Sequence, residues 1–155
     1  MAYKLFINGN TLPASDLNTA FGTSGWTAYT PTESGMSGTH TTTAYYMQIG
    51  KTVWFHIRVT MGATMTMSTV TFSFPVAPSA NVTQRDVLGS CRATDVSASK
   101  AWFGQTLVNA GPLIAPAVPT SSADNTSSPI TGTIPFGVAW ASGDVLTLNG
   151  FYEAA

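Results

Sequence analysis

The stretch that decides the fold is TTTAYYMQIGKTVWFHIRVTM, residues 41–61. It contains two runs of strand-forming residues, Thr41 to Ile49 and Thr52 to Met61, which are separated only by Gly50 and Lys51. A glycine at the first position of a two-residue connection permits the positive φ that a type II′ turn requires. These residues therefore predict an antiparallel β-hairpin.

Side chains along the second run of this hairpin alternate between two chemically different faces. The apolar face, which we expect in the core, comprises Val53, Phe55, Ile57 and Val59. The other face carries an aromatic ring, an imidazole and a guanidinium, and subunit interfaces are enriched in Trp and Arg. An ordinary solvated sheet face is the alternative. With one aromatic residue from the last predicted strand, the candidate interface residues are Trp54, His56, Arg58 and Phe151.

Short runs of the same kind recur along the rest of the chain. Those bounded by turn residues are Met67 to Phe74, Val87 to Thr94, Ala101 to Val108, Thr133 to Ala139 and Val145 to Tyr152. A succession of about eight such strands predicts an all-β sandwich or barrel. The stretch 109–132 holds four prolines and a polar serine-rich run. It predicts an exposed loop with room for one short strand near Leu113.

The composition fits one soluble β domain whose copies associate. A chain of 155 residues is long enough for a single core. Only 8% of the residues are charged and 44% are apolar, whereas 24 Thr and 15 Ser supply uncharged polar groups. Branched Thr suits a pleated, half-exposed surface. Because charged surface is scarce and the last strand is apolar on both faces, we expect the excess apolar surface to be covered by other copies.

Several partner classes are disfavoured by charge and cysteine content. The net charge is −1, and six basic residues are spread from Lys4 to Lys100, so we expect neither nucleic acid nor a membrane as partner. The single Cys91 has no intrachain disulfide partner and is expected to be a small buried apolar residue. The apolar run Leu5 to Ile7 is shorter than a signal-peptide core, which predicts synthesis in the cytosol.

The sequence carries no recognisable catalytic or metal-binding pattern. The common hydrolase, nucleotide and metalloprotease signatures are absent from it. His40 and His56 have no cysteine or carboxylate neighbours at ligand spacing. The seven carboxylates show no pairing of the kind that glycosidases use, although folding can bring two together. We therefore expect a protein that is not an enzyme and that has no cofactor, metal or catalytic residues.

Residues 1–24 differ from the rest of the chain and are predicted to be an attachment segment. They hold a short apolar strand, Tyr3 to Ile7, and too little apolar area for a core of their own. The glycine-rich break Gly22 to Gly25 separates them from a domain that spans residues 25–155. The candidate attachment residues are Phe6, Ile7, Leu12, Leu17 and Phe21.

Several stretches resemble proteins of tailed-bacteriophage particles. FINGNTLPASDLN, residues 6–18, resembles a segment near the start of many phage fibre and appendage proteins, with Pro13 in place of their usual Thr. The terminal domains of such proteins are similar to WTAYTPT (26–32), YYMQIGKTVWF (45–55), FSFP (72–75) and NGFYEAA (149–155). The resemblance implies a virion protein, assembled in the host bacterial cytoplasm, with a homotrimeric antiparallel jelly-roll β-sandwich like those of tumour-necrosis-factor-like and complement-type heads.

Two roles follow from this resemblance. The first is a decoration or head-fibre protein that binds other virion proteins, of the capsid or the tail, through residues 1–24; the chain lacks the heptads or Gly-X-Y repeats of a long fibre. The alternative is a receptor-binding tail tip that recognises a bacterial surface glycan through aromatic platforms such as Trp102 or Tyr29. Core packing is the favoured explanation for those two residues, because aromatic side chains dominate core energetics.

Overall fold

The computed structural model describes residues 25–111, 113–119, 127–133, 135, 137 and 139–155. These residues form ten β-strands and contain no helix. The predicted attachment segment 1–24, with Phe6, Ile7, Leu12, Leu17 and Phe21, lies outside the described residues. The strands are β1 (Thr27–Tyr29), β2 (Glu33–Ser37), β3 (His40–Ile49), β4 (Thr52–Met61), β5 (Thr66–Ser73), β6 (Val87–Asp95), β7 (Lys100–Asn109), β8 (Leu113–Pro119), β9 (Ser127–Pro129) and β10 (Val145–Glu153).

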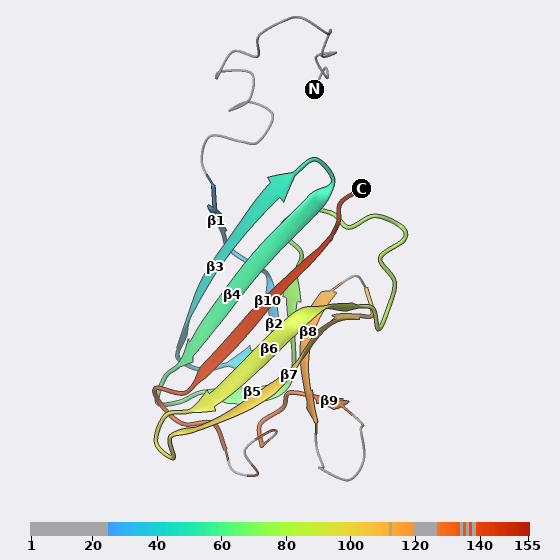
Figure 1. Ribbon diagram of the computed structural model, residues 1–155. Coiled ribbons are helices and arrows are strands. Elements are labelled where there is room, and N and C mark those ends of the chain that lie inside the picture. The colour runs from blue at the N-terminus through green and yellow to red at the C-terminus, as the bar shows by residue number, and fades with distance from the viewer. Residues whose placement is uncertain (1–24, 112, 120–126, 134, 136, 138) are drawn as a thin grey trace, which may run out of the picture.

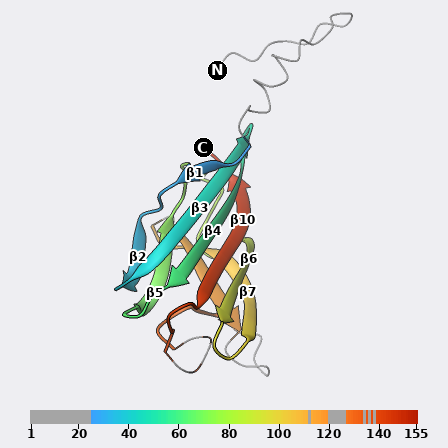
Figure 2. The same cartoon turned by 90° about the vertical axis from the view of Figure 1, so that its left-hand side faces the viewer.

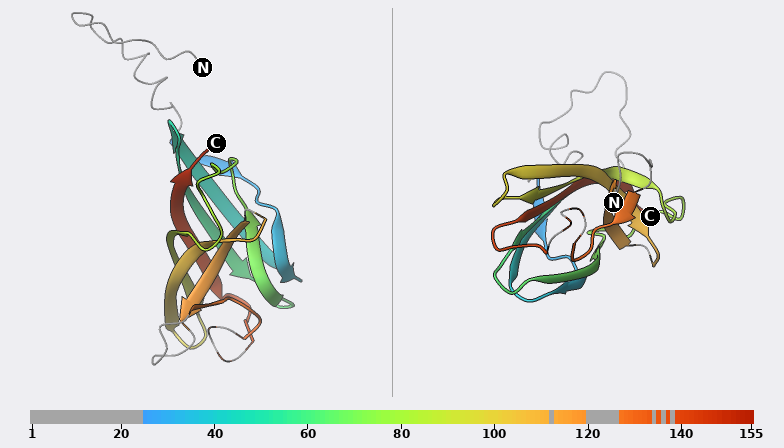
Figure 3. Two further views of the ribbon diagram at one scale, coloured as in Figure 1. Left: turned by 90° about the vertical axis from the view of Figure 1, so that its right-hand side faces the viewer. Right: turned by 90° about the horizontal axis from the view of Figure 1, so that it is seen from below.

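All ten strands belong to one antiparallel sheet that curls around the core (Figure 1). The order is β1-β3-β4-β10-β6-β7-β8-β5-β2, with β9 paired to β8. Seen from below, the strands surround a common interior (Figure 3). The first and last strands of this order, β1 and β2, are consecutive in sequence. One segment of chain therefore passes from one edge of the sheet to the other edge. The prediction of an all-β antiparallel domain is confirmed.

The β3–β4 hairpin has the predicted register. Ile49 pairs with Thr52, which leaves a two-residue connection, and Gly50 has a φ of 60°. The expected core face of β4 is buried: Val53, Phe55, Ile57 and Val59 are each at most 1% exposed.

One sequence prediction about the segment before β10 is confirmed in part, and another is wrong. The short strand expected near Leu113 is present as the seven-residue strand β8, but its Ile114 and Val118 are fully buried, so this part of the stretch 109–132 is not an exposed loop. The predicted strand Thr133 to Ala139 is not a strand at any of its described residues. Instead, the Gly137 N–H donates to the Thr133 carbonyl over 2.6 Å, because Gly137 adopts a φ of 73° that turns the chain.

The sheet has two different ends. At the hairpin end, the Ala154 N–H donates to the carbonyl of Lys51 over 2.7 Å, and Thr27 pairs with Tyr46 close by. The start of β1 and the C-terminus therefore lie at the same end (Figure 2). At the opposite, turn end, the connections 62–65, 96–99 and 141–144 come together, and Asp144 accepts a hydrogen bond from the Val96 N–H over 3.0 Å.

Candidate functional site

The outer face of β3, β4, β10, β6 and β7 brings the four predicted interface residues together. Trp54, His56 and Arg58 point outward from β4, opposite to the buried set of that strand. Phe151 on β10 lies directly across from Trp54. Their role in an interface is a prediction that the placement alone does not test.

Aromatic rings are unusually exposed on this face. The exposed fractions are 69% for Phe103, 60% for Phe151, 50% for Trp26 and 39% for Tyr45. Trp26 comes directly before β1, and Tyr45 pairs with His56 across β3 and β4. We call this outer surface the aromatic face and define it by Trp26, Tyr45, Trp54, Phe103 and Phe151.

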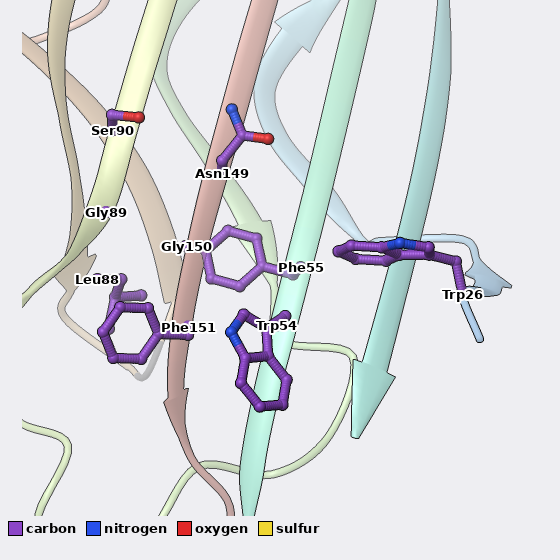
Figure 4. A pocket seen from close by; sticks show the side chains of 9 residues that line it. All are labelled: Trp26, Trp54, Phe55, Leu88, Gly89, Ser90, Asn149, Gly150 and Phe151. Carbon is purple, nitrogen blue, oxygen red and sulfur yellow. The ribbon is translucent and has the colours of Figure 1, made fainter. Parts of the chain in front are cut away.

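Two shallow hollows flank Trp26 on the aromatic face. One, of about 280 Å³, is bordered by Trp26, Trp54 and Phe151 over the backbone of Gly89 and Gly150. The rings of Trp54 and Phe151 lie near each other on β4 and β10, and the ring of Trp26 lies over the neighbouring strand β3 (Figure 4).

The second hollow, of about 380 Å³, is lined by Trp26, Tyr45, His56 and Asn149. Trp26 and Asn149 line both hollows, so the two adjoin. We call the two adjoining hollows together the depression; aromatic rings border it, and the polar side chains of His56 and Asn149 are part of its lining.

Polar side chains on this face already bind one another. Nδ1 of His56 lies 2.6 Å from Oδ1 of Asn149. Because an amide oxygen only accepts, the Nδ1–H of His56 is the donor. The Arg92 guanidinium lies 5.7 Å from the centre of the Phe103 ring, which is a cation–π distance.

The aromatic platforms suggested for glycan binding lie elsewhere. Trp102 and Tyr29 are partly buried and pack against the core, in agreement with core packing as their expected role. Tyr29 meets the ring of Tyr46 edge-on at 5.8 Å, and burial raises the pKa of its hydroxyl well above the usual range. His40 is also remote from the aromatic face, because its Nε2 contacts Glu33.

The buried carboxylates of the described residues hold turns. Asp144 is 1% exposed and accepts hydrogen bonds from the backbone N–H groups of Val96 and Ala141. Asp95 accepts from the Ser97 hydroxyl and the Ala98 N–H, and these donors lower the pKa of its carboxyl. Both acids thus serve the turn end of the sheet.

In the part of the chain that the structure describes, no group of three or more His, Cys, Asp or Glu side chains is arranged to hold a metal ion. The same residues contain no helix that is long and apolar enough to cross a membrane.

Sequence patterns did not single out Trp26, Tyr45 or Phe103 of the aromatic face, nor Asn149 beside it. For Tyr45 a signal exists, because period-two alternation places it opposite the buried Ala44. Asn149 meets His56 through pairing across 93 positions of sequence, and local pattern carries no signal for such a distant register.

Comparison with known proteins finds no family model, no curated protein and no solved structure that matches this chain.

Proposed function

We propose that this protein is a structural protein of a tailed-phage virion, displayed on the particle surface as a small homotrimeric decoration or head-fibre protein. The observation that carries the proposal is the polarity of the domain. Gly25 and Ala155 both lie at the hairpin end, so residues 1–24 join the domain there, and the turn end faces away from the attachment point. A domain displayed on a particle needs one end for attachment and the other end free.

The stretches that resemble phage appendage proteins are neighbours in space. Residues 26–32 include β1, which pairs with β3; residues 45–55 form the tip of the hairpin; and residues 149–155 end β10, which pairs with β4. All three therefore meet at the hairpin end, next to the junction with residues 1–24. Their clustering supports a shared role in attachment.

We further propose that the curled sheet is an antiparallel jelly roll. The path of the chain supports this, because β1 lies at one edge of the sheet and the next strand, β2, lies at the other. This crossing places β3 and β4 across the core from β5. Phe55 of β4 and Phe72 of β5 are both fully buried in this common core.

Labelling of purified particles tests the role directly. Gold-conjugated antibody against this chain is expected to decorate the capsid surface in electron micrographs. Label restricted to the tail tip would favour the alternative below, and particles without label would overturn the virion role.

The division of labour is tested with a chain that begins at Gly25. It is expected to fold with an unchanged β-sheet circular dichroism spectrum and to lose binding to particles that lack the protein. The full chain is the control. Failure to fold, or normal particle binding, would contradict an attachment role for residues 1–24.

The second candidate is a receptor-binding tail tip for a bacterial surface glycan. The larger hollow favours it, because the rings of Trp26 and Tyr45 adjoin the polar side chains of His56 and Asn149. Ligand sites combine apolar walls with a few polar groups in this manner. Retention of the full chain on immobilised host cell-wall glycan, lost on Tyr45→Ala, would support this candidate.

A further inference from the structure

We propose that the aromatic face is the surface through which copies of this chain bind one another, with Trp26 and Phe151 as its central anchors. The inference deepens the proposed function and takes only the copy number of three from it. The contact is a packing of faces and not a pairing of sheet edges.

The size of the face suits a stable association. Its strands β3, β4, β10, β6 and β7 are each nine or ten residues long. At a strand spacing of about 4.8 Å and a rise of about 3.3 Å per residue, the face measures roughly 24 Å by 30 Å. The area of the face is therefore close to that of a standard protein interface, which buries about 800 Å² on each partner.

The arrangement of its side chains matches the anatomy of an interface. Trp26, Trp54 and Phe151 surround the depression, where large aromatic anchors are most effective because their surroundings exclude water. Arg58 is exposed toward the turn end of β4, beyond the rings, where a polar rim is expected. The rings of one copy can enter the hollows of the next.

Two pairs of polar side chains keep their partners when the face is covered. The His56 imidazole and the Asn149 amide are hydrogen-bonded to each other, and Arg92 is stacked on Phe103. A polar group that keeps its partner costs much less to bury than one that loses it. A sugar site needs donors and acceptors that are free to bind hydroxyls. The pairing takes up one nitrogen of His56 and the oxygen of Asn149, which favours a protein surface over a glycan as the occupant.

The sheet edges offer a poorer contact. The outermost strands β1 and β2 are three and five residues long, and β2 is interrupted by a bulge between Ser34 and Met36. So short an edge supplies few backbone hydrogen bonds to an added strand. A partner copy therefore gains more from the face.

The test is the mass of the full chain in solution, measured by light scattering across a concentration series. The wild type is expected at about three times 16.2 kDa at micromolar concentration. Phe151→Asp and Trp26→Asp are each expected to weaken association about 30-fold or more and to give the monomer mass. Phe151→Trp, which keeps a large ring, is expected to remain assembled.

Val96→Asp is the matched control. Val96 is 53% exposed, as the anchors are, but lies in the β6–β7 turn away from the aromatic face, so this variant is expected to keep the wild-type mass. Trp26 precedes the first strand, so Trp26→Asp leaves the β-ladders intact if Phe151→Asp disturbs β10. Circular dichroism of each variant verifies the fold.

A monomeric wild type, or anchor variants that keep the assembled mass, would overturn the proposal. A monomer that binds host glycan and loses that binding in Trp26→Asp would assign the face to a sugar instead. Failure of the virion role is separate, because it appears as particles without label while the purified chain still assembles through Trp26 and Phe151.

Discussion

Nε2 of His40 lies 2.7 Å from Oε2 of Glu33, and this contact joins strands near the two opposite edges of the curled sheet. Glu33 begins β2, the last strand of the sheet order, whereas His40 begins β3, the second. Nδ1 of the same ring lies 3.2 Å from the Gly38 carbonyl. The imidazole thus contacts both β2, at the opposite edge of the sheet, and the turn that connects β2 to β3.

This contact should be measurable in the stability of the domain. His40→Ala and Glu33→Ala are each expected to lower the free energy of unfolding by about 1 kcal/mol, since a hydrogen bond to a charged or polar partner is worth about that much. The double variant should lose less than the sum, which urea denaturation of all four proteins will show. Strict additivity would mean that the contact contributes nothing.

The hairpin tip gives a second prediction. Gly50→Val is expected to destabilise the domain by about 1–3 kcal/mol, because a β-branched residue resists the positive φ of 60° found there. The added side chain meets no atom within 4 Å, so the loss is backbone strain alone. Lys51→Val, at the next position, is the control. Melting temperatures indistinguishable between the two variants would contradict the type II′ turn.

Burial decides the third prediction. Asp144→Asn places an amide where both carboxylate oxygens accept backbone N–H groups, and one donor then faces another donor. An expected loss of about 1–3 kcal/mol follows from an unsatisfied buried donor. Asp86→Asn is the matched control, since the exposed Asp86 also accepts a backbone N–H, from Thr83 over 2.7 Å, but water can replace that bond. Equal losses in urea denaturation would refute the role of burial.

Cys91 makes stability depend on alkaline pH. Burial raises the pKa of its thiol from 9.0 to about 11, and the thiol lies 3.6 Å from the Ala117 carbonyl. The unfolded chain therefore loses this proton first, so its contribution is complete below pH 9 and is lost as the pH rises toward 11. Cys91→Ala should flatten this part of the stability profile. In the native protein at pH 8, we expect the thiol to react with Ellman's reagent far more slowly than in urea.

Local pattern was sufficient for the strands whose alternation is strict. On β4 the buried residues Val53 to Val59 and the outward Trp54 follow directly from period two, and the glycine at position 50 sets the register. The order of the strands was beyond reach, because the pairing of β10 with β4 and β6 joins segments far apart in sequence. The aromatic face depends on that pairing, so the sequence predicted only Trp54 and Phe151 among the residues that define it.

Pro116 does not interrupt β8. Pro116 pairs in register with Thr106 of β7, but its carbonyl accepts the Ile130 N–H on the other side of the strand. In an antiparallel strand the N–H and carbonyl of one residue point to the same side, so the missing N–H of Pro116 interrupts nothing in the β7 ladder. Composition alone cannot tell which side of a strand a proline faces.

The short, bulged outer strands bear on how the chain survives before it assembles. A sequence so rich in Thr and so poor in charge contains strands that favour cross-β aggregation, which grows by adding chains to an open edge. Here the long strands β4 and β10 are paired on both sides, and the segments at the two ends of the sheet order are only three and five residues long. Short, bulged outer strands of this kind disfavour the edge-to-edge addition of further chains by which fibrils grow.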